Sequence, residues 1–370
     1  MIFRTAQAKA LAATAVTSLA AALTVGLTTA SGAAAGGGRG HHVRLDRVFV
    51  IVLENHSKHS VIGDHTPYLT ALAHRYGQAT QYYGVTHPSE PNYVAMISGS
   101  NWWTNNDDPT NRFHHTNLVD GLQARHISWG AYEEALPHTG SLADFWPSES
   151  QPLYASKHNP FVLFTDIRDN PARLAHVKPY TALAGDLNSR HAPRFVFIVP
   201  DQCNDMHGGV TAHIKGHPET PCPYSNANDD RNDIRLKHNA DRFVRGAVTT
   251  ITHSRAWTRH SAIFIVADEG DYNGDKVNGG WASPAGCCDS PVLPAGDPDI
   301  SPKWPGGLYG GGLVPAVVID PAGPRHFTSG TAYNHYSMLR TIEDAWRLPE
   351  LAFTADHAQV KTMNEFLAGH

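Results

Sequence analysis

The sequence predicts an α/β fold: a three-layer α/β/α sandwich around a mostly parallel central sheet. Short apolar runs rich in Val, Ile and Phe alternate along the chain with longer segments of helical periodicity. Within the runs, apolar and polar residues do not alternate strictly, which is typical of strands covered on both faces. Strands that alternate with helices indicate crossover connections, and these favour parallel pairing.

Four strands and four helices are the clearest elements. The predicted strands are Val48–Leu53, Phe195–Val199, Ala262–Ala267 and Val314–Ile319. The predicted helices are Thr66–Tyr76, Asn117–Arg125, Asp233–His253 and Tyr336–Trp346. Residues 271–312 are dense in Gly, Pro, Asp and Trp and are interpreted as one long loop. Loops of that length are usually functional or disordered.

The N-terminus predicts export. Arg4 and Lys9 stand before and at the edge of an apolar, Ala-rich run, and small residues ending in Ala33-Ala34-Ala35 follow it. This order is typical of a secretory signal peptide, with an uncleaved membrane anchor as the alternative. No later segment is apolar and long enough to cross a bilayer. The expected division is a signal peptide over 1–35, a flexible Gly-rich leader over 36–42 and a single domain over 43–370.

The charge balance argues against a nucleic-acid partner. The 370 residues carry a formal net charge of −5, and loss of Arg4 and Lys9 makes the mature chain more acidic. A nucleic-acid-binding domain normally presents a basic face. The 24 histidines are mostly interpreted as surface residues, and they predict stability and activity that change at mildly acidic pH.

The four cysteines are compatible with disulfides in an exported protein. They are Cys203, Cys222, Cys287 and Cys288, which leave three pairings open. A bond between the adjacent Cys287 and Cys288 would be strained. We therefore expect two bridges that tie the 203–222 segment to the 287–288 loop. A zinc site is the alternative, but the spacing typical of one is absent.

Three of the four predicted strands run into acidic residues. The first ends at Glu54-Asn55, the second at Asp201 and the third at Asp268-Glu269. Ligands of open α/β sheets bind beyond the carboxyl ends of the strands. Acidic groups that meet there repel one another unless a cation lies between them. Any single one can instead cap a helix, but the run of three predicts a divalent metal site.

The segment His87–Tyr93 carries a candidate nucleophile. Pro91 suits the first turn of a helix that continues through Ile97, which places Ser89 at or just before the N-cap with its hydroxyl exposed. Helix N-termini favour phosphate, and Asn92 could donate to a phosphate oxygen. Serine needs a base or a metal to become a nucleophile, and the G-x-S-x-G nucleophile elbow is absent. An ordinary helix cap is the alternative; the acidic strand ends favour activation by a metal.

Three further segments offer polar groups. Asp201, Asp205 and His207 fall on one short loop, and this mixture suits a second metal, a general acid for the leaving oxygen or an ordinary turn. His335 opens the last predicted helix, close to the strand ends. Lys157 offers a cation that could meet phosphate, and a solvated surface lysine is the alternative.

The main predicted metal site offers oxygen donors only, from Glu54, Asn55, Ser89, Asp268 and Glu269. Ca²⁺, Mg²⁺ and Mn²⁺ prefer oxygen, whereas Zn²⁺ usually takes some nitrogen or sulfur. The identity of the divalent metal therefore stays open among Ca²⁺, Mg²⁺, Mn²⁺ and Zn²⁺.

Taken in order, these motifs resemble a known family. It is the phosphoesterase family of non-specific phospholipases C and secreted acid phosphatases, within the alkaline-phosphatase-like superfamily. The match runs from Glu54 to Trp346. The segments that carry it are Val52–Ser57, His87–Tyr93, Lys157–Pro160, Asp201–His207, Asp268-Glu269 and His335–Ser337.

The resemblance implies an alkaline-phosphatase-like sandwich with long active-site loops and a phosphoesterase catalytic domain over 43–370. It implies that Ser89 attacks phosphorus and forms a phosphoserine beside a metal. The implied metal ligands are Glu54, Asn55, Ser89, Asp268 and Glu269. Asp201, from the loop after the second predicted strand, is a candidate ligand for a second site. The implied groups near the leaving oxygen or second metal are Asp205, His207 and His335. The implied phosphate-binding residues are His56, Asn92, Lys157 and His158.

Departures from the family pattern narrow the expected activity. Zinc phosphatases of the superfamily carry histidine where Glu269 stands, and sulfatases need an arginine that Ser89–Tyr93 lacks. The longer phospholipases C carry C-terminal domains that this chain lacks. We expect a secreted acid phosphatase that acts on small phosphomonoesters.

Two alternatives remain open. A phospholipase C would need a lipid-facing surface, for which Trp102, Trp103, Trp281 and Trp304 are candidates. A secreted protein that binds metal or phosphate without turnover belongs to another class. The oligomeric state is left open.

Overall fold

The computed structural model describes residues 43–225, 228–271 and 282–369. All of these residues belong to one compact unit. The predicted signal peptide and leader, over 1–35 and 36–42, lie outside the described residues, as does Trp281. Among the described residues, no helix is both long and apolar enough to cross a bilayer.

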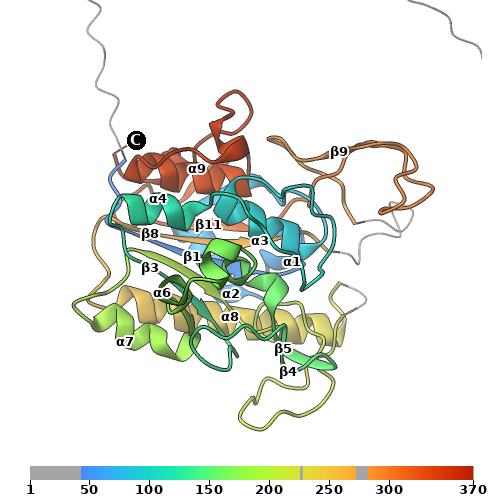
Figure 1. Ribbon diagram of the computed structural model, residues 1–370, viewed down its shortest axis with the longest axis horizontal. Coiled ribbons are helices and arrows are strands. Elements are labelled where there is room, and N and C mark those ends of the chain that lie inside the picture. Colours follow the sequence, from blue (N-terminus) through green and yellow to red (C-terminus); the bar gives the residue numbers. More distant parts are fainter. Residues whose placement is uncertain (1–42, 226–227, 272–281, 370) are drawn as a thin grey trace, which may run out of the picture. The chain divides into compact units, whose positions relative to one another are not determined.

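One large sheet forms the centre of the described chain (Figure 1). Its eight strands lie in the order β12-β2-β11-β8-β1-β7-β3-β6. All neighbouring strands pair in parallel except β11, which is antiparallel to both β2 and β8. The strand bounds are β1 (Arg47–Leu53), β2 (Gly77–Tyr83), β3 (Trp129–Glu133), β6 (Val177–Pro179), β7 (Phe195–Val199), β8 (Ser261–Ala267), β11 (Ala316–Ile319) and β12 (Phe327–Asn334).

Helices cover both faces of this sheet, as Figure 1 shows. One layer contains α3 (Ser89–Ser98), α4 (Leu118–Ala124) and α9 (His335–Trp346). The other contains α2 (Pro67–Arg75), α7 (Leu183–Asn188) and α8 (Arg231–Thr252). In α8 a single apolar stripe is buried, through Leu236, Ala240, Val244, Ala247 and Ile251. The predicted three-layer α/β/α sandwich with a mostly parallel sheet is confirmed.

The predicted strands and helices all exist, within a few residues of their expected ends. The strand expected over 314–319 begins at Ala316, and it runs antiparallel to its neighbours. Its amino end therefore lies at the sheet edge where β1 and β8 end. This reversal explains why it contributes no acidic residue from its carboxyl end to that edge.

Smaller elements lie in the connections. The described part of the 271–312 loop contains a short hairpin of β9 (Val292–Leu293) and β10 (Gly307–Leu308). A second two-stranded sheet pairs β4 (Phe145–Ser148) with β5 (Gln151–Ala155). The short α-helices are α1 (Lys58–Val61), α5 (Thr165–Arg168) and α6 (Pro171–Leu174), and the 3₁₀ segments are η1 (Ser156–His158), η2 (Pro160–Val162), η3 (Tyr180–Ala182), η5 (Ala352–Ala355) and η6 (Asn364–Phe366).

The predicted disulfide pairing was wrong. Cys203 bonds to Cys222, with Cα atoms 5.4 Å apart, and Cys287 bonds to Cys288. The two pairs lie against different elements. The carbonyl of Cys203 accepts a hydrogen bond from Asn239 of α8, whereas the disulfide sulfur of Cys288 lies 3.5 Å from the carbonyl oxygen of Ala332 in β12. Cross-bridges between the two segments are therefore not formed.

A buried carboxyl group on α9 makes the free energy of unfolding depend on pH. Glu343 is fully buried, and its Oε1 accepts a hydrogen bond from the backbone N–H of Leu351 at 3.1 Å. Its other oxygen has no hydrogen-bond partner. Burial raises the pKa of Glu343 to about 8. The folded protein thus keeps a proton on this group over a pH range in which the unfolded chain releases it.

Glu343→Gln is expected to make stability less dependent on pH. Because the folded pKa lies above the unfolded value of about 4.3, the contribution of Glu343 is fully present below that unfolded pKa. It is lost as pH rises through the folded pKa of about 8. The slope is at most about 1.4 kcal/mol per pH unit for one proton. Urea unfolding between about pH 5 and about pH 8 should therefore show the variant gaining stability over wild type as pH rises. Parallel pH profiles for the two proteins would contradict this assignment.

Candidate active site

The carboxyl ends of β1 and β8 bring their acidic residues together. The two strands are parallel neighbours, with Leu53 paired to Ala267, so Glu54 and Asp268 leave the sheet side by side. The backbone N–H of Asn55 donates to Asp268 Oδ1 at 3.0 Å. Asn55 has a φ of 53°, a left-handed conformation that asparagine tolerates better than most residues. This turn directs both side chains toward the same edge of the sheet.

Ser89 lies between two of these carboxylates. Its Oγ is 3.0 Å from Glu54 Oε2 and 3.0 Å from Glu269 Oε1. A hydroxyl carries one proton and donates to only one acceptor at a time, so one carboxylate oxygen faces the Ser89 oxygen without sharing its proton. Pro88 is the N-cap of α3 and Ser89 is its first residue. The expectation of an exposed Ser89 hydroxyl was wrong, since the residue is only 1% exposed.

A seam of glycines holds the Ser89 segment against the Asp268 segment. The Gly311 N–H donates to the Gly84 carbonyl at 3.0 Å, and the Gly270 N–H donates to the Gly311 carbonyl at 2.7 Å. A Cβ added to Gly84 would lie 2.7 Å from the carbonyl oxygen of Asp268, and one added to Gly311 would lie 2.5 Å from that of Thr86. Only glycine permits these backbones to approach so closely.

Several buried polar atoms at this edge have no hydrogen-bond partner. They are Glu54 Oε1, Asn55 Oδ1, Asp205 Oδ2, Asp268 Oδ2 and His158 Nε2. Buried polar atoms are normally paired. His158 joins this group directly, with Nε2 3.2 Å from Glu54 Oε1 and Nδ1 3.5 Å from Asp205 Oδ2. Unpaired carboxylate, amide and imidazole atoms at one edge of the sheet are the kind of donors that suit a divalent cation.

The electrostatics of the site lead to the same conclusion. Burial, and then repulsion from Asp268 and Asp205, raises the pKa of Glu54 well above its usual value. Burial and Glu269 raise the pKa of Asp268 to about 7. Burial also raises the pKa of Glu269, although His87 opposes this effect. A bound cation would favour the ionised form of all these groups.

A lysine and a histidine form the cationic side of the site. Lys157 Nζ donates to Asp107 Oδ2 at 2.9 Å and to His207 Nε2 at 3.2 Å. Burial opposes the charge of Lys157, but Asp107 and Glu54 outweigh burial and raise its pKa. Burial and Lys157 lower the pKa of His207 to about 3, so its ring is neutral. The imidazole Nδ1 then donates to the Gly208 carbonyl at 2.9 Å.

Asp205 belongs to the same site through the backbone and its carboxyl group. Its carbonyl accepts a hydrogen bond from the Glu54 N–H at 2.7 Å, and its Oδ1 accepts one from the His207 N–H at 2.7 Å. The ligand atoms of Glu54, His158 and His207 lie within 4.8 Å of one another. Nitrogen donors therefore adjoin the oxygen donors, and the donor set accommodates zinc as well as harder cations.

Asn92, which was expected to bind phosphate, has its side-chain amide engaged within its own loop. The Asn92 carbonyl accepts hydrogen bonds from the N–H groups of Val85 and Thr86, at 2.8 and 3.2 Å. Its amide donates to the carbonyls of Thr86 and Pro88, at 2.7 and 2.9 Å. Both donors and both acceptor positions are engaged. Asn92 therefore holds the loop that leads to Ser89 and has no donor left for phosphate.

His56, which was also expected to bind phosphate, contacts α8 and the main chain of Glu54. Its Nε2 lies 2.6 Å from Asp233 Oδ1, and its Nδ1 lies 3.0 Å from the Glu54 carbonyl oxygen. Asp233 is ion-paired at 2.6 Å to Lys237, which is fully buried. With both ring nitrogens engaged, His56 connects the backbone of Glu54 to α8.

His335 lies behind the site rather than beside Ser89. Its Nε2 is 2.6 Å from the Asp268 carbonyl oxygen, and its Nδ1 is 3.1 Å from the Tyr82 hydroxyl. Burial lowers the pKa of His335 to about 4. These contacts suit a residue that positions Asp268, and they leave no ring nitrogen for the leaving oxygen.

Asp201 does not join the Ser89 site. Its Oδ1 accepts hydrogen bonds from the N–H groups of Cys203 and Asn204, at 3.0 and 3.1 Å. Its Oδ2 instead faces His217, at 3.9 Å from Nδ1. The loop after β7 therefore directs Asp205 and Asp201 to different places.

Two residues at the site were missed by the sequence analysis. His87 lies within hydrogen-bonding contact of Glu269, and Asp107 accepts from both Lys157 and the Glu90 N–H. His87 stands in the same short segment as Ser89, which is a signal that could have marked it. Asp107 lies in a loop and carries no comparable signal.

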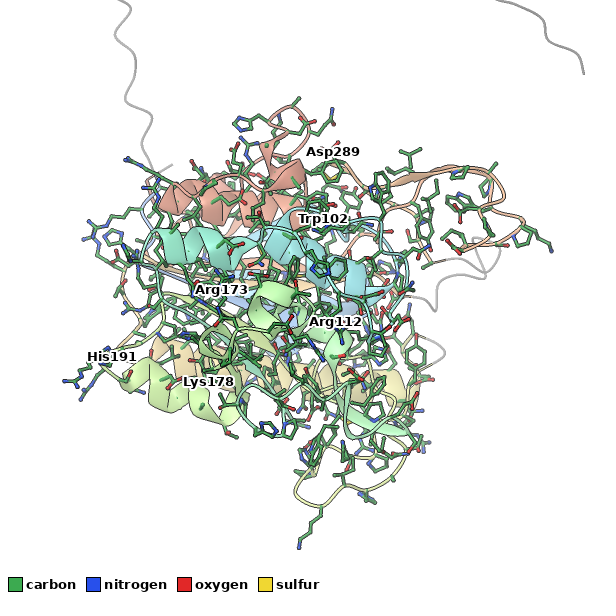
Figure 2. All side chains as sticks on the ribbon, in the orientation of Figure 1. Trp102, Arg112, Arg173, Lys178, His191 and Asp289 are labelled. Carbon is green, nitrogen blue, oxygen red and sulfur yellow. A yellow bond between two sulfur atoms is a disulfide. The ribbon has the colours of Figure 1, made fainter. Side chains whose placement is uncertain are left out.

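The tryptophans expected to form a lipid surface are mostly packed. Trp102, labelled in Figure 2, stacks on His115 with ring centroids 3.5 Å apart and donates to Ser98 at 2.9 Å. Trp304 is 4% exposed, whereas Trp103 is 79% exposed. Among the described residues, only Trp103 of the four expected tryptophans presents a largely exposed ring.

The fold and the site define a class of protein: a mostly parallel α/β sandwich with a serine and clustered carboxylates at the carboxyl ends of its strands. The model of the Phosphoesterase family matches residues 62–217 and 223–349. The chain therefore belongs to the Phosphoesterase family.

Two curated relatives match most of this chain, and a third matches less than half of it. A phosphate-repressible acid phosphatase of Penicillium chrysogenum is 26% identical over 83% of this chain and 60% of its own length. An acid phosphatase of Aspergillus niger is 31% identical over 77% of this chain and 55% of its own length. A phosphatidylinositol-3-phosphatase of Mycobacterium tuberculosis is 33% identical over 45% of this chain and 52% of its own length. The chain thus spans little more than half of these relatives.

Solved structures share the fold at low sequence identity. A phosphonate monoester hydrolase of Agrobacterium radiobacter has a TM-score of 0.50 at 14% identity, covering 88% of this chain and 77% of that one. A lipoteichoic acid synthase of Listeria monocytogenes also has a TM-score of 0.50, at 10% identity over the same shares of the two chains. At such identities the likeness establishes the fold alone.

Proposed function

We propose that this protein is a secreted, metal-dependent acid phosphatase that hydrolyses phosphomonoesters through a phosphoserine at Ser89. The observation that carries the proposal is the position of the Ser89 hydroxyl, 3.0 Å from both Glu54 and Glu269, within a cluster of unpaired buried acceptors. Family membership and the phosphatase relatives support phosphoester hydrolysis.

A divalent cation would be held by Glu54, Asn55, Asp268 and Glu269, with Ser89 beside it. When bound, it would lower the pKa of the Ser89 hydroxyl and neutralise charge on the phosphate oxygens. His158 is the nearest nitrogen donor. These are the ligands that the family resemblance implied, with His158 added.

The chain's own residues account for the first half of the reaction. Ser89 Oγ attacks the phosphorus, and its proton passes to Glu54 or Glu269, both of which it already faces. The ester oxygen leaves as the phosphorus–oxygen bond breaks. The Lys157 ammonium, held by Asp107, places positive charge beside the phosphate oxygens. Catalysis of this kind depends mainly on positioning and on charge neutralisation.

Water completes the cycle by attacking the phosphoserine on the opposite side. The Ser89 oxygen then leaves and regains a proton from the carboxyl group that received it. The Lys157 ammonium, which donates to His207 Nε2, gives a proton to the departing oxygen of the substrate and regains one from the attacking water. His335 is assigned to positioning Asp268 because its ring nitrogens are engaged elsewhere.

Small phosphomonoesters fit the chain better than intact phospholipids do. A phospholipase C needs an apolar surface near its site, and of the expected tryptophans only Trp103 is largely exposed among the described residues. The relatives named above are phosphatases. Comparing turnover of an aryl phosphate with that of phosphatidylcholine separates the two functions. Faster turnover of phosphatidylcholine would replace the proposal with the phospholipase.

The phosphoserine can be trapped. When the protein is mixed with an aryl phosphate and quenched in acid, we expect the peptide that contains Ser89 to gain the mass of one phosphoryl group. The signal should be absent without substrate. A peptide that stays unmodified, despite a burst of released phenol that equals the enzyme concentration, would place the intermediate on another residue.

A further inference from the structure

A second group of potential ligands lies where Asp201 faces away from Ser89. Asp201 is 1% exposed, and its Oδ2 has no hydrogen-bond partner although Oδ1 has two. A buried carboxylate oxygen without a partner carries a large desolvation cost. It is therefore an independent indication that a positively charged partner belongs beside it.

The loop between the two disulfide-bonded cysteines of the 203–222 segment supplies the neighbours. His217 Nδ1 lies 3.9 Å from Asp201 Oδ2 and 2.8 Å from Glu219 Oε1. The ligand atoms of all three residues lie within 4.8 Å of one another. These separations bracket those expected around a tetrahedral ion with bonds of about 2.0–2.2 Å to nitrogen and carboxylate oxygen.

The loop holds His217 and Glu219 in place by its own contacts. The Thr220 hydroxyl donates to the His217 carbonyl at 2.7 Å and accepts from the Ile214 N–H at 2.9 Å. The bond between Cys203 and Cys222 ties the loop to the segment that follows Asp201. The ligand residues are thus fixed to one another by short stretches of chain.

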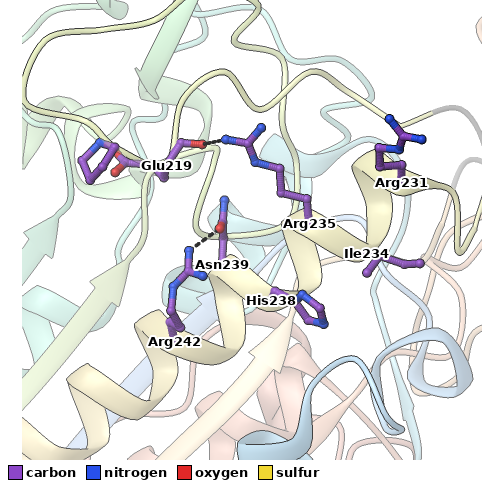
Figure 3. Close-up of a pocket in the computed structure, with 8 residues that line it drawn as sticks. Glu219, Arg231, Ile234, Arg235, His238, Asn239 and Arg242 are labelled. Carbon is purple, nitrogen blue, oxygen red and sulfur yellow. Dashed lines mark hydrogen bonds between the residues drawn. The ribbon is translucent and has the colours of Figure 1, made fainter.

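A third anchor comes from α8. Figure 3 shows Arg235 reaching from the helix to Glu219, and its guanidinium donates to the Glu219 main-chain carbonyl at 3.0 Å. The helix and the loop together line a cavity of about 430 Å³. Because Arg235 binds the main chain, the Glu219 carboxylate stays available to His217.

A further carboxylate supports Asp201 from behind. Glu134 Oε2 accepts from the Asp201 N–H and from the Asn204 side chain, each at 3.0 Å. The carboxylates of Asp201, Glu219 and Glu134 thus lie near a single imidazole, that of His217. Ionised, they place more negative charge at this largely buried site than one imidazole can balance.

We propose that Asp201, His217 and Glu219 form a second divalent-cation site of the zinc type, separate from the Ser89 site. One imidazole nitrogen with carboxylate oxygens suits zinc, whereas calcium needs more oxygen donors than these residues supply. The ion fastens the loop over residues 210–222 to the end of β7. The alternative is an ion pair between protonated His217 and the two carboxylates, with no metal. The proposal does not depend on the proposed function.

Counting bound zinc tests this site in the full mature chain. After chelator stripping and titration with zinc alone, His217→Ala and Glu219→Gln are each expected to bind one equivalent fewer than wild type. His213→Ala is the matched control, since His213 is an exposed histidine of the same loop. Far-UV circular dichroism confirms that each variant is folded. Equal zinc content in wild type and His217→Ala, or an equal loss in His213→Ala, would overturn the proposal.

A second measurement separates this site from the Ser89 site. In the Glu54→Gln background, which weakens the Ser89 site, added Co²⁺ should still give a visible absorption band. His217→Ala in that background should remove the band. Loss of the band in Glu54→Gln alone would mean that the ion binds only at the Ser89 site, and the proposal would fail even if the phosphatase function holds. The phosphatase activity of Glu54→Gln is measured separately. If activity is lost while the Co²⁺ band is retained, both the proposed function and the second site are supported.

Discussion

Ser89→Ala is expected to lower kcat for an aryl phosphate by roughly 10³–10⁶-fold, with the fold intact. Alanine removes the oxygen that attacks phosphorus and leaves the neighbouring carboxylates in place. The buried Ser89 hydroxyl is the only side-chain group that joins Glu54 to Glu269 among the described contacts. Steady-state kinetics of the purified variant measure the effect, and residual turnover would come from water attacking directly.

Ser98→Ala is the matched control for this change. Ser98 is equally buried at the far end of the same helix, where its hydroxyl donates to the Val94 carbonyl at 2.8 Å. We expect this variant to lose some stability and to keep its kcat within a few-fold of wild type. If Ser89→Ala retained wild-type turnover, another group would have to be the nucleophile.

Glu54→Gln is expected to separate activity from stability. Activity should fall by roughly 10³-fold or more, which corresponds to about 4 kcal/mol of transition-state stabilisation. In metal-free protein the same change should raise stability at pH values above the unfolded pKa of the carboxyl group. The raised pKa of Glu54 in the folded state means that its stabilising contribution is present below the unfolded pKa of about 4.3 and is lost as pH rises. Glutamine avoids this loss because it never ionises.

Thermal unfolding with and without added metal tests whether Glu54 contributes to metal binding. Wild type should show a rise in Tm when Zn²⁺, Mn²⁺ or Ca²⁺ is added after stripping, and Glu54→Gln should show a smaller rise. Glu133→Gln is the control, since Glu133 is a buried carboxyl group at the end of β3 whose pKa is raised by burial. That variant should keep both activity and the response to metal. A Glu54→Gln protein that is fully active would remove Glu54 from the site.

The sheet and the main cluster were predictable because their determinants are local. Apolar runs such as 262–267 fix the strands, and parallel pairing then brings Glu54 and Asp268 to one edge without further information. The direction of β11 was not predictable, since its apolar run reads the same in either orientation. The disulfide pairing was also missed, because it depends on which elements the two loops pack against.

The roles of the histidines and of Asn92 depended on contacts that no sequence pattern specifies. His56 and His335 stand in motifs next to the site, yet their ring nitrogens bind Asp233, Tyr82 and main-chain oxygens. His158 was expected to bind phosphate but lies 3.2 Å from Glu54, as a metal ligand would. Whether an imidazole faces substrate, metal or backbone is decided by distances of a few ångströms between segments far apart in the chain.

The glycine seam fixes the position of the Ser89 segment relative to the segment that carries Asp268 and Glu269. Gly84 precedes the segment that carries Ser89, Gly270 follows Glu269, and Gly311 binds the main chain of both. A methyl group at Gly84 or Gly311 would clash with a main-chain carbonyl oxygen of the neighbouring segment, so the two segments would have to move apart. The distance between Ser89 and the carboxylates is thus set by close contacts between main-chain atoms. A substitution at one of these glycines would change that distance without contacting the substrate.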